Sequence, residues 1–324
     1  MLMAKVADLY YLRDLTQQEI ADRLGLSRPT VSRLLHRSRA AGIVRIEVVP
    51  PDAAHHVLER ELEQRFGLRE VIVVAGQGEA QTTQATTLGR AAARFLERTV
   101  KRGTTIGVSW GTTLRAVVDH LRQKPLRPTV VPLVGGVGQI SPRIHANDVA
   151  RAIGDAFGGR VHMLHAPAIV ASRRVRQALV RDTEIARVLA LARRVELALV
   201  GIGALVPSST LVQSGYFSAH DLLALRKRGA IGDICTRLFA SDGTPLDGEL
   251  DRRILAVELR DLRRIPTVVA VARGAAKAEA IRGALAGRLV DVLVTDHLAA
   301  REILRLETLP AAGRAARPRQ EARP

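Results

Sequence analysis

Two different hydrophobic patterns divide the chain. In its first part, apolar positions recur at helical spacing and predict three helices, over about 3–13, 16–25 and 27–41. From residue 70 onward, short runs of Val, Ile and Leu alternate with helical stretches. Near-continuous apolar strands between helices are typical of a parallel sheet covered on both faces. The pattern therefore predicts an N-terminal all-α unit followed by a large doubly wound, mostly parallel α/β domain.

The predicted strands can be placed from their apolar runs. They are EVIVV at 70–74, TTIGVS at 104–109, TVVPLVGG at 129–136, RVHMLHAP at 160–167, LALVGIG at 197–203, PTVVAVA at 266–272 and VDVLVTD at 290–296. Intervening helices are expected at 88–100 and 278–285. One further strand, IVRIEVV at 43–49, is expected to close the N-terminal unit, and an apolar stripe predicts a helix over 53–66.

Capping signals define the second and third helices. Thr16 can cap the second helix while Glu19, three residues later, completes a capping box. Gly25 permits the left-handed turn that ends this helix, and Ser27 is a good N-cap for the third, where Pro29 is tolerated in the first turn. Two helices joined so tightly also need a small residue at their crossing and a miniature core. Ala21 supplies the first, and Ile20, Leu24, Leu26, Val31 and Leu34 supply the second.

These offsets predict a helix-turn-helix whose third helix enters the major groove of DNA. Between Arg28 and Arg45 there are five basic residues and no acidic one. The candidate contacts to bases or phosphates are Gln17, Ser27, Arg28, Thr30, Ser32, Arg33, His36 and Arg37. An ordinary helical hairpin with solvated arginines is the alternative. Such motifs also occur in recombinases and sigma factors, so the motif alone indicates DNA binding rather than regulation.

Composition narrows the classes of partner, site and compartment that remain for this protein. The formal net charge of +17 favours polyanionic partners, although a GC-rich coding sequence would also raise the arginine content. The single cysteine, Cys235, excludes an internal disulfide, and the nine histidines lack metal-ligand spacing. No run reaches the length of a membrane span, and the first residues lack the apolar segment of a signal peptide. We therefore expect a cytoplasmic protein without a metal or a cofactor.

Several motifs in the second part occur in an order that resembles the SorC family of sugar-responsive transcriptional regulators. They are GVSWGTT at 107–113, VPLVGG at 131–136, ALVGIGA at 198–204, GAIGDI at 229–234 and DVLVTD at 291–296. The resemblance covers the chain from Ala4 to about Leu309. It implies a sugar-binding domain similar to sugar-phosphate isomerases and deaminases, a homodimer or homotetramer, and a phosphosugar effector that alters binding to a DNA operator.

The candidate effector residues come from both lines of argument. GVSWGTT follows a strand and opens a helix, where backbone donors and the hydroxyls of Ser109, Thr112 and Thr113 could hold a phosphate, with Gly111 permitting close approach. The resemblance assigns Lys277 to the phosphate and Asp233 to effector hydroxyls or to a relic of an isomerase base. Gly135, Gln139, Arg143 and Gly203 are expected to line the same crevice. Each feature could alternatively be structural, and Trp110 is expected to pack rather than to stack on a ligand.

The expected organisation is a helix-turn-helix domain over 1–51, a linking helix over 52–68, an effector domain over 69–309 and a disordered basic tail over 310–324. Two functions from different classes remain. One is a regulator that binds its effector without turnover and reads paired half-sites as a symmetric oligomer. The other is an active sugar-phosphate isomerase or deaminase tethered to DNA, for which no second acid/base partner of Asp233 is evident. A recombinase would need a nucleophile or carboxylate cluster that we do not find.

Overall fold

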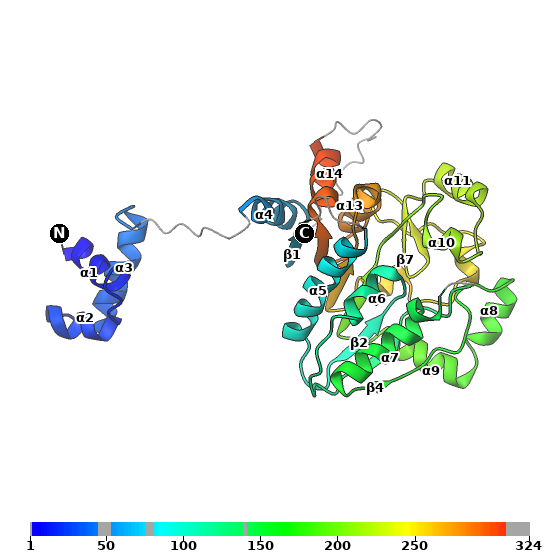
Figure 1. Ribbon diagram of the computed structural model, residues 1–324, viewed down its shortest axis with the longest axis horizontal. Coiled ribbons are helices and arrows are strands. Elements are labelled where there is room, and N and C mark those ends of the chain that lie inside the picture. Colours follow the sequence, from blue (N-terminus) through cyan, green and yellow to red (C-terminus); the bar gives the residue numbers. More distant parts are fainter. Residues whose placement is uncertain (1, 45–52, 76–80, 139–140, 309–324) are drawn as a thin grey trace, which may run out of the picture. The chain divides into compact units, whose positions relative to one another are not determined.

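The computed structural model describes residues 2–44, 53–75, 81–138 and 141–308. The chain forms two compact units, and the boundary between them falls between residues 53 and 54. The first unit consists of α1 (Leu2–Tyr11), α2 (Gln17–Leu24) and α3 (Arg28–Ala40), as predicted (Figure 1). All but the first two residues of the strand expected at 43–49 lie outside the described residues, as does the expected tail over 310–324.

The core of the first unit is built from the apolar stripes of its three helices. Its buried members are Val6, Leu9, Ile20, Ala21, Val31 and Leu35, with Leu24, Leu26 and Leu34 partly buried against them. The expected miniature core is therefore present, and α1 adds a third layer to it. Burial of these side chains is what holds so short a unit together, because each buried aliphatic side chain contributes about 1.5–3 kcal/mol.

The second unit contains a seven-stranded, wholly parallel sheet with the order β1-β10-β9-β5-β2-β3-β4. The strands are β1 (Glu70–Val74), β2 (Thr105–Val108), β3 (Thr129–Pro132), β4 (Arg160–Val161), β5 (Leu197–Gly201), β9 (Thr267–Val271) and β10 (Val292–Asp296). All seven predicted strands form this sheet, and the predicted α/β fold class is confirmed.

Helices cover both faces of the sheet. The helices of this unit are α4 (Ala53–Phe66), α5 (Gln81–Thr99), α6 (Thr112–Val118), α7 (Ala146–Phe157), α8 (Arg173–Leu179), α9 (Thr183–Ala192), α10 (Thr210–Gln213), α11 (Ala219–Lys227), α12 (Leu259–Leu262), α13 (Ala278–Ala286) and α14 (His297–Thr308). One core packs α5, α6 and α7, which lie side by side, against the sheet (Figure 1). The other core packs α4, α9, α13 and α14. Side chains of each strand alternate between the two, as Leu199 and Val200 do on β5.

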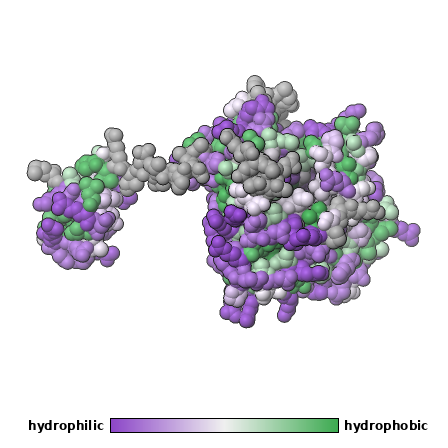
Figure 2. Space-filling view, viewed as in Figure 1, coloured by the Kyte–Doolittle hydropathy of each residue, from purple (hydrophilic) through white to green (hydrophobic). Residues whose placement is uncertain are grey.

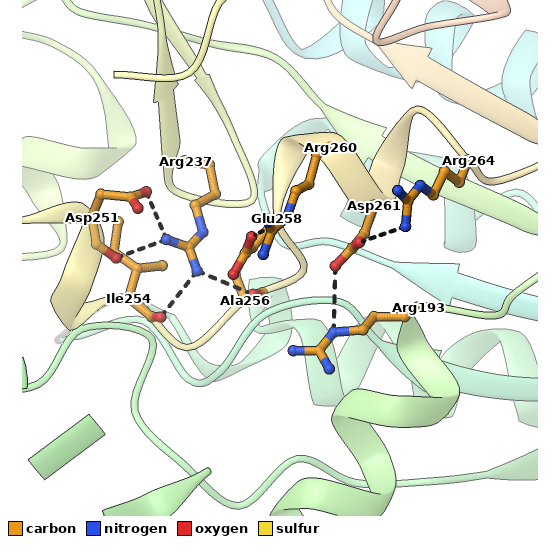
Figure 3. A network of polar contacts seen from close by, with 9 residues as sticks. All are labelled: Arg193, Arg237, Asp251, Ile254, Ala256, Glu258, Arg260, Asp261 and Arg264. Atoms are coloured by element: carbon orange, nitrogen blue, oxygen red, sulfur yellow. Dashed lines mark hydrogen bonds and ion pairs between the residues drawn. The ribbon is translucent and has the colours of Figure 1, made fainter. Parts of the chain in front are cut away.

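A small antiparallel sheet that the sequence did not predict joins this framework. It consists of β6 (Gly203–Ala204), β7 (Gly232–Ile234) and β8 (Arg237–Phe239). Arg237, whose side chain is 3% exposed, braces it by bonding Asp251 Oδ1 at 2.6 Å and the carbonyl oxygens of Asp251, Ile254 and Ala256 at 2.7, 3.2 and 3.3 Å (Figure 3). Ala256 in turn bridges Val134 beyond β3, which ties the small sheet to the large one.

The strand order determines where a ligand can enter. The chain continues from β2 to β3 on one side and from β5 to β9 on the other, although β2 and β5 are neighbours. A crevice forms at such a switch point, outside the carboxyl ends of the strands. Elsewhere, hydrophilic side chains predominate on the face of this unit drawn in Figure 2. Among the described residues, no helix has the length and apolar character needed to span a bilayer.

Candidate DNA-binding helix and effector cleft

The turn between α2 and α3 has the predicted local chemistry. The Thr16 backbone N–H donates to Glu19 Oε2 at 2.8 Å, and the Glu19 N–H donates to Thr16 Oγ1 at 3.3 Å, which completes the capping box. Gly25 ends α2 with φ of +64°, and the Ser27 hydroxyl accepts from the Thr30 N–H at 3.4 Å. These caps set the start of α3 relative to α2, as a groove-reading helix requires.

Most of the candidate DNA contacts are exposed on the first unit. Ser27, Arg28, Ser32, Arg33, His36 and Arg37 are exposed, while Gln17 and Thr30 are partly buried. The hydroxyls of Ser27 and Thr30 lie 2.8 Å apart and hydrogen-bond to each other. Both are therefore already engaged at the start of α3, whereas the arginines present their guanidinium groups to solvent.

A cleft of about 380 Å³ opens at the switch point between β2 and β5. The segments that follow β2, β5 and β9 line it, together with the turn between β7 and β8. Seven of the predicted effector residues meet there. They are Ser109, Gly111, Thr112, Thr113, Gly203, Asp233 and Lys277. These residues are separated by as many as 168 positions in the sequence, so the parallel sheet is what brings them together.

Two other predicted residues, Gly135 and Arg143, are not part of the cleft lining. A Cβ atom on buried Gly135 would lie 2.5 Å from the carbonyl oxygen of Ala166, so this glycine is required by close backbone packing. Arg143 is largely exposed and lies 3.7 Å from Asp119, with which it forms an ion pair. Gln139 lies outside the described residues.

The carboxylate of Asp233 lies in the floor of the cleft. Its side chain is 5% exposed, and its Oδ2 accepts from the Thr236 N–H at 3.1 Å. Burial raises its pKa to about 6, and the nearby charge of Lys277 partly opposes this rise. Gly203 pairs with Asp233 across the small sheet, and a Cβ there would lie 1.9 Å from Asp233 Oδ1. Any larger residue at 203 would displace the carboxylate.

Backbone strain accompanies this carboxylate. Cys235 and Thr236 form the turn between β7 and β8 with φ of +53° and +66°. Such a turn usually contains Asn and Gly, and a β-branched residue in the left-handed region costs about 1–3 kcal/mol. The bond from the Thr236 N–H to Asp233 helps to hold this conformation. Strain of this kind is concentrated at ligand sites, where the surrounding structure maintains it.

Lys277 lies at the end of a short 3-10 helix (Ala275–Lys277) that follows β9. Its Nζ donates to the carbonyl oxygen of Ile202 at 2.8 Å, which holds the ammonium group against the segment after β5. Burial lowers the pKa of Lys277, whereas the charge of Asp233 raises it. Lys277 and Asp233 therefore place an ammonium group and a carboxylate close together in the low-dielectric part of the cleft.

Sequence reasoning missed part of the lining. Arg273, Gly274 and the hydroxyl-bearing segment Ser208–Thr210 also line the cleft. Ser209 is the N-cap residue of α10, yet its hydroxyl does not cap that helix, unlike Ser172 at the start of α8. Its Oγ is buried and has no hydrogen-bond partner within the described residues. A cluster of hydroxyl residues after a predicted strand was the available signal.

Trp110, the only tryptophan of the chain, also lines the cleft and is 8% exposed. It belongs to the hydrophobic core on the α13 side of the sheet, in keeping with the packing role expected of it. Its position at the cleft makes its fluorescence a reporter of occupancy.

Comparison with known proteins identifies both units. Residues 53–305 match the family model of a sugar-binding domain, and residues 9–54 match the MarR family model. The deoxyribonucleoside regulator of Bacillus subtilis is 33% identical over 94% of this chain and 97% of its own length. The sorbitol operon regulator of Klebsiella pneumoniae is 31% identical over 94% and 98%. The chain belongs to the SorC family of transcriptional regulators.

Solved structures agree with this assignment. The full-length sorbitol operon regulator SorC from Klebsiella pneumoniae superposes with a TM-score of 0.75 over 94% of this chain and 98% of its own, at 31% identity. A DeoR family transcriptional regulator from Listeria monocytogenes gives 0.72 over 77% and 99%, at 32% identity. As a SorC-family protein, the chain combines a DNA-binding helix-turn-helix with a sugar-binding domain, and effector binding modulates its binding to DNA.

Proposed function

We propose that the cleft is the effector site of this regulator and that the effector is a phosphorylated sugar. The observation that carries the proposal is the meeting of Ser109, Thr112, Thr113 and Lys277 in one cleft at the switch point. Hydroxyl groups and an ammonium group are suitable partners for phosphate oxygens, and Arg273 adds positive charge. Asp233 is a suitable acceptor for sugar hydroxyls, since a carboxylate accepts strong hydrogen bonds.

The proposed DNA contacts are the exposed arginines of α3. Arg28 and Arg33 can pair with guanine edges, and Gln17 and Arg37 can contact phosphates. One helix-turn-helix contacts few base pairs, so we infer a homodimer or homotetramer whose paired units read half-sites of an operator. Because such DNA lies in the bacterial cytoplasm, this is where the protein would act.

Binding without turnover is favoured over isomerase or deaminase activity. Burial raises the pKa of the Cys235 thiol to about 12, so the thiol stays protonated at neutral pH and is a poor nucleophile. Among the residues that the structure describes, no group of three or more His, Cys, Asp or Glu side chains could hold a metal ion. Coupled assays on phosphosugars would reveal turnover if the alternative held.

A thermal-shift panel tests the proposed effector site. The panel contains inorganic phosphate, ribose 5-phosphate, 2-deoxyribose 5-phosphate, glucose 6-phosphate, sorbitol 6-phosphate and unphosphorylated sorbitol. We expect a phosphosugar to raise Tm, because a ligand that binds only the native state stabilises it. Lys277→Ala and Thr112→Val should abolish this shift and the effector response while leaving DNA binding intact. Unchanged dose responses in both variants would exclude the cleft as the site.

A further inference from the structure

One buried carboxylate joins the cleft to a helix on the opposite side of its wall. Asp296, at the end of β10, is 3% exposed. Its Oδ2 accepts from the N–H of Gly274, a cleft-lining residue, at 2.7 Å. Its Oδ1 accepts from the N–H of Ala299, in the first turn of α14, at 2.8 Å. A movement of the cleft wall at Gly274 therefore reaches the start of α14 through the Asp296 side chain, in addition to the direct packing of the 3-10 helix Ala275–Lys277 against α14.

The next residue contacts the first helix of the second unit. His297 is 3% exposed, and neither ring nitrogen has a hydrogen-bond partner in the described part of the chain. Its ring stacks on that of His55, on α4, with centroids 6.1 Å apart. Burial and the charge of Arg301 lower the pKa of His297, while the charge of Asp296 opposes this change. The contact is thus a packing contact that a shift of α14 would change.

α4 is held against the sheet by two more carboxylates. Glu63 Oε1 accepts from the Val71 N–H and Glu59 Oε1 accepts from the Val73 N–H, both at 2.8 Å. These N–H groups belong to β1, an edge strand, and would otherwise lack partners in the sheet. β1 pairs with β10, so that Val74 lies opposite Asp296. A second connection therefore runs from Asp296 through β1 to α4.

We propose that Asp296 is the positioning residue that couples occupancy of the cleft to α4, and through α4 to the DNA-binding unit that precedes it in the chain. An effector held by the segment after β9 changes the position of the Gly274 N–H. The carboxylate of Asp296 moves with this N–H group or loses the hydrogen bond to it. Either change alters the start of α14, the contact between His297 and His55, and the position of α4 against the sheet. This inference rests on the proposed effector site and adds the route by which that site regulates DNA binding.

The test measures coupling in the full chain rather than binding alone. Operator affinity is determined by fluorescence anisotropy on a duplex from the protein's own upstream region, with and without a saturating amount of the best-binding phosphosugar of the panel. The ratio of the two Kd values is the coupling factor, which is typically about 5–150 in allosteric proteins. Effector Kd is measured separately from Trp110 fluorescence, so that saturation is verified for every variant.

Asp296→Asn keeps the size of the side chain but places an amide nitrogen against one of two backbone N–H donors. We expect its coupling factor to fall to within about 2-fold of unity, while operator Kd without effector changes by less than about 3-fold. The matched control is Asp291→Asn, next to the other end of β10, where the carboxylate accepts from the Val268 N–H at 2.7 Å. This control should lose comparable stability and keep the wild-type coupling factor.

A second pair of variants avoids the interior of the fold. His55→Ala removes the ring that stacks on His297 from partly exposed α4, and we expect it to reduce the coupling factor at least 3-fold. Val57→Ala, at a position of α4 that is 45% exposed, should leave the factor unchanged. Wild-type coupling in both Asp296→Asn and His55→Ala, or equal loss in the two controls, would overturn the inference. If no phosphosugar alters DNA binding by the wild type, the proposed effector site fails, and this route with it.

Discussion

Replacing Asp233 with asparagine should make the ligand-free protein more stable at neutral pH. The buried carboxylate has a pKa of about 6 in the folded chain, against an ordinary value of 3.8. The folded state therefore binds the proton more tightly than the unfolded state. The contribution of Asp233 to the free energy of unfolding is therefore most favourable at low pH. It falls as the pH rises from about 4 to about 6 and stays low above that range.

The size of the effect follows from this pKa difference. At pH 7.5 this pKa difference lowers the free energy of unfolding by about 3 kcal/mol. At pH 5 it lowers the free energy of unfolding by about half as much. Asparagine has no charge to desolvate, and its oxygen can still accept from the Thr236 N–H. The pKa of about 6 already includes the attraction between Asp233 and Lys277, so the loss of that attraction is not subtracted again. For a domain of this size the corresponding rise in Tm is up to about 10 °C.

The assay is thermal or urea unfolding of wild type and Asp233→Asn at pH 7.5 and pH 5, without effector. The gain in the free energy of unfolding caused by Asp233→Asn should be about twice as large at pH 7.5 as at pH 5. Asp242→Asn is a control in which the effect on stability should have the opposite sign. Hydrogen bonds from the backbone and the side chain of Thr244 lower the pKa of Asp242 in the folded state. That substitution should destabilise at neutral pH. A lower Tm for Asp233→Asn at pH 7.5, or equal gains at both pH values, would refute the reasoning.

Four further substitutions give separable outcomes. Arg33→Ala should weaken operator binding about 5- to 150-fold, the value of one bidentate base contact, and leave effector-induced thermal stabilisation unchanged; equal loss of both would show that the two units are not separable. Ser209→Ala should weaken effector binding about 3- to 10-fold without lowering Tm, since the Ser209 hydroxyl has no hydrogen-bond partner among the described residues. Ser172→Ala, in contrast, removes a helix cap and should lower Tm only. Arg237→Ala should cost about 3–5 kcal/mol in urea unfolding, because it leaves Asp251 and buried carbonyl groups unpaired; a loss below about 1 kcal/mol would contradict the bracing role.

Local signals predicted the framework of this fold well. The apolar runs at all seven strands are long enough to be recognised, and a parallel sheet buried on both faces needs little else from each strand. The capping box at Thr16 and Glu19 and the cap at Ser27 depend only on residues three positions apart, so α2 and α3 could be placed closely. Interactions between distant residues were not needed for either prediction.

The small antiparallel sheet and the packing role of Gly135 could not be predicted in this way. Its strands have only two or three residues each, too few to show a period, and the turn at Cys235 and Thr236 lacks the usual turn residues. Gly135 was assigned to the cleft because of its motif, but its role depends on the backbone at Ala166, which is distant in sequence. Contacts that are made only in three dimensions leave no local pattern.

The most direct test of the whole account is a titration of the full-length chain against its upstream duplex over a range of salt concentrations, with and without the best phosphosugar. We predict binding that weakens steeply with salt, that exceeds binding to a random duplex, and whose affinity the phosphosugar changes at least 5-fold. Equal affinity for the two duplexes at every salt concentration, with no effect of any phosphosugar, would contradict it.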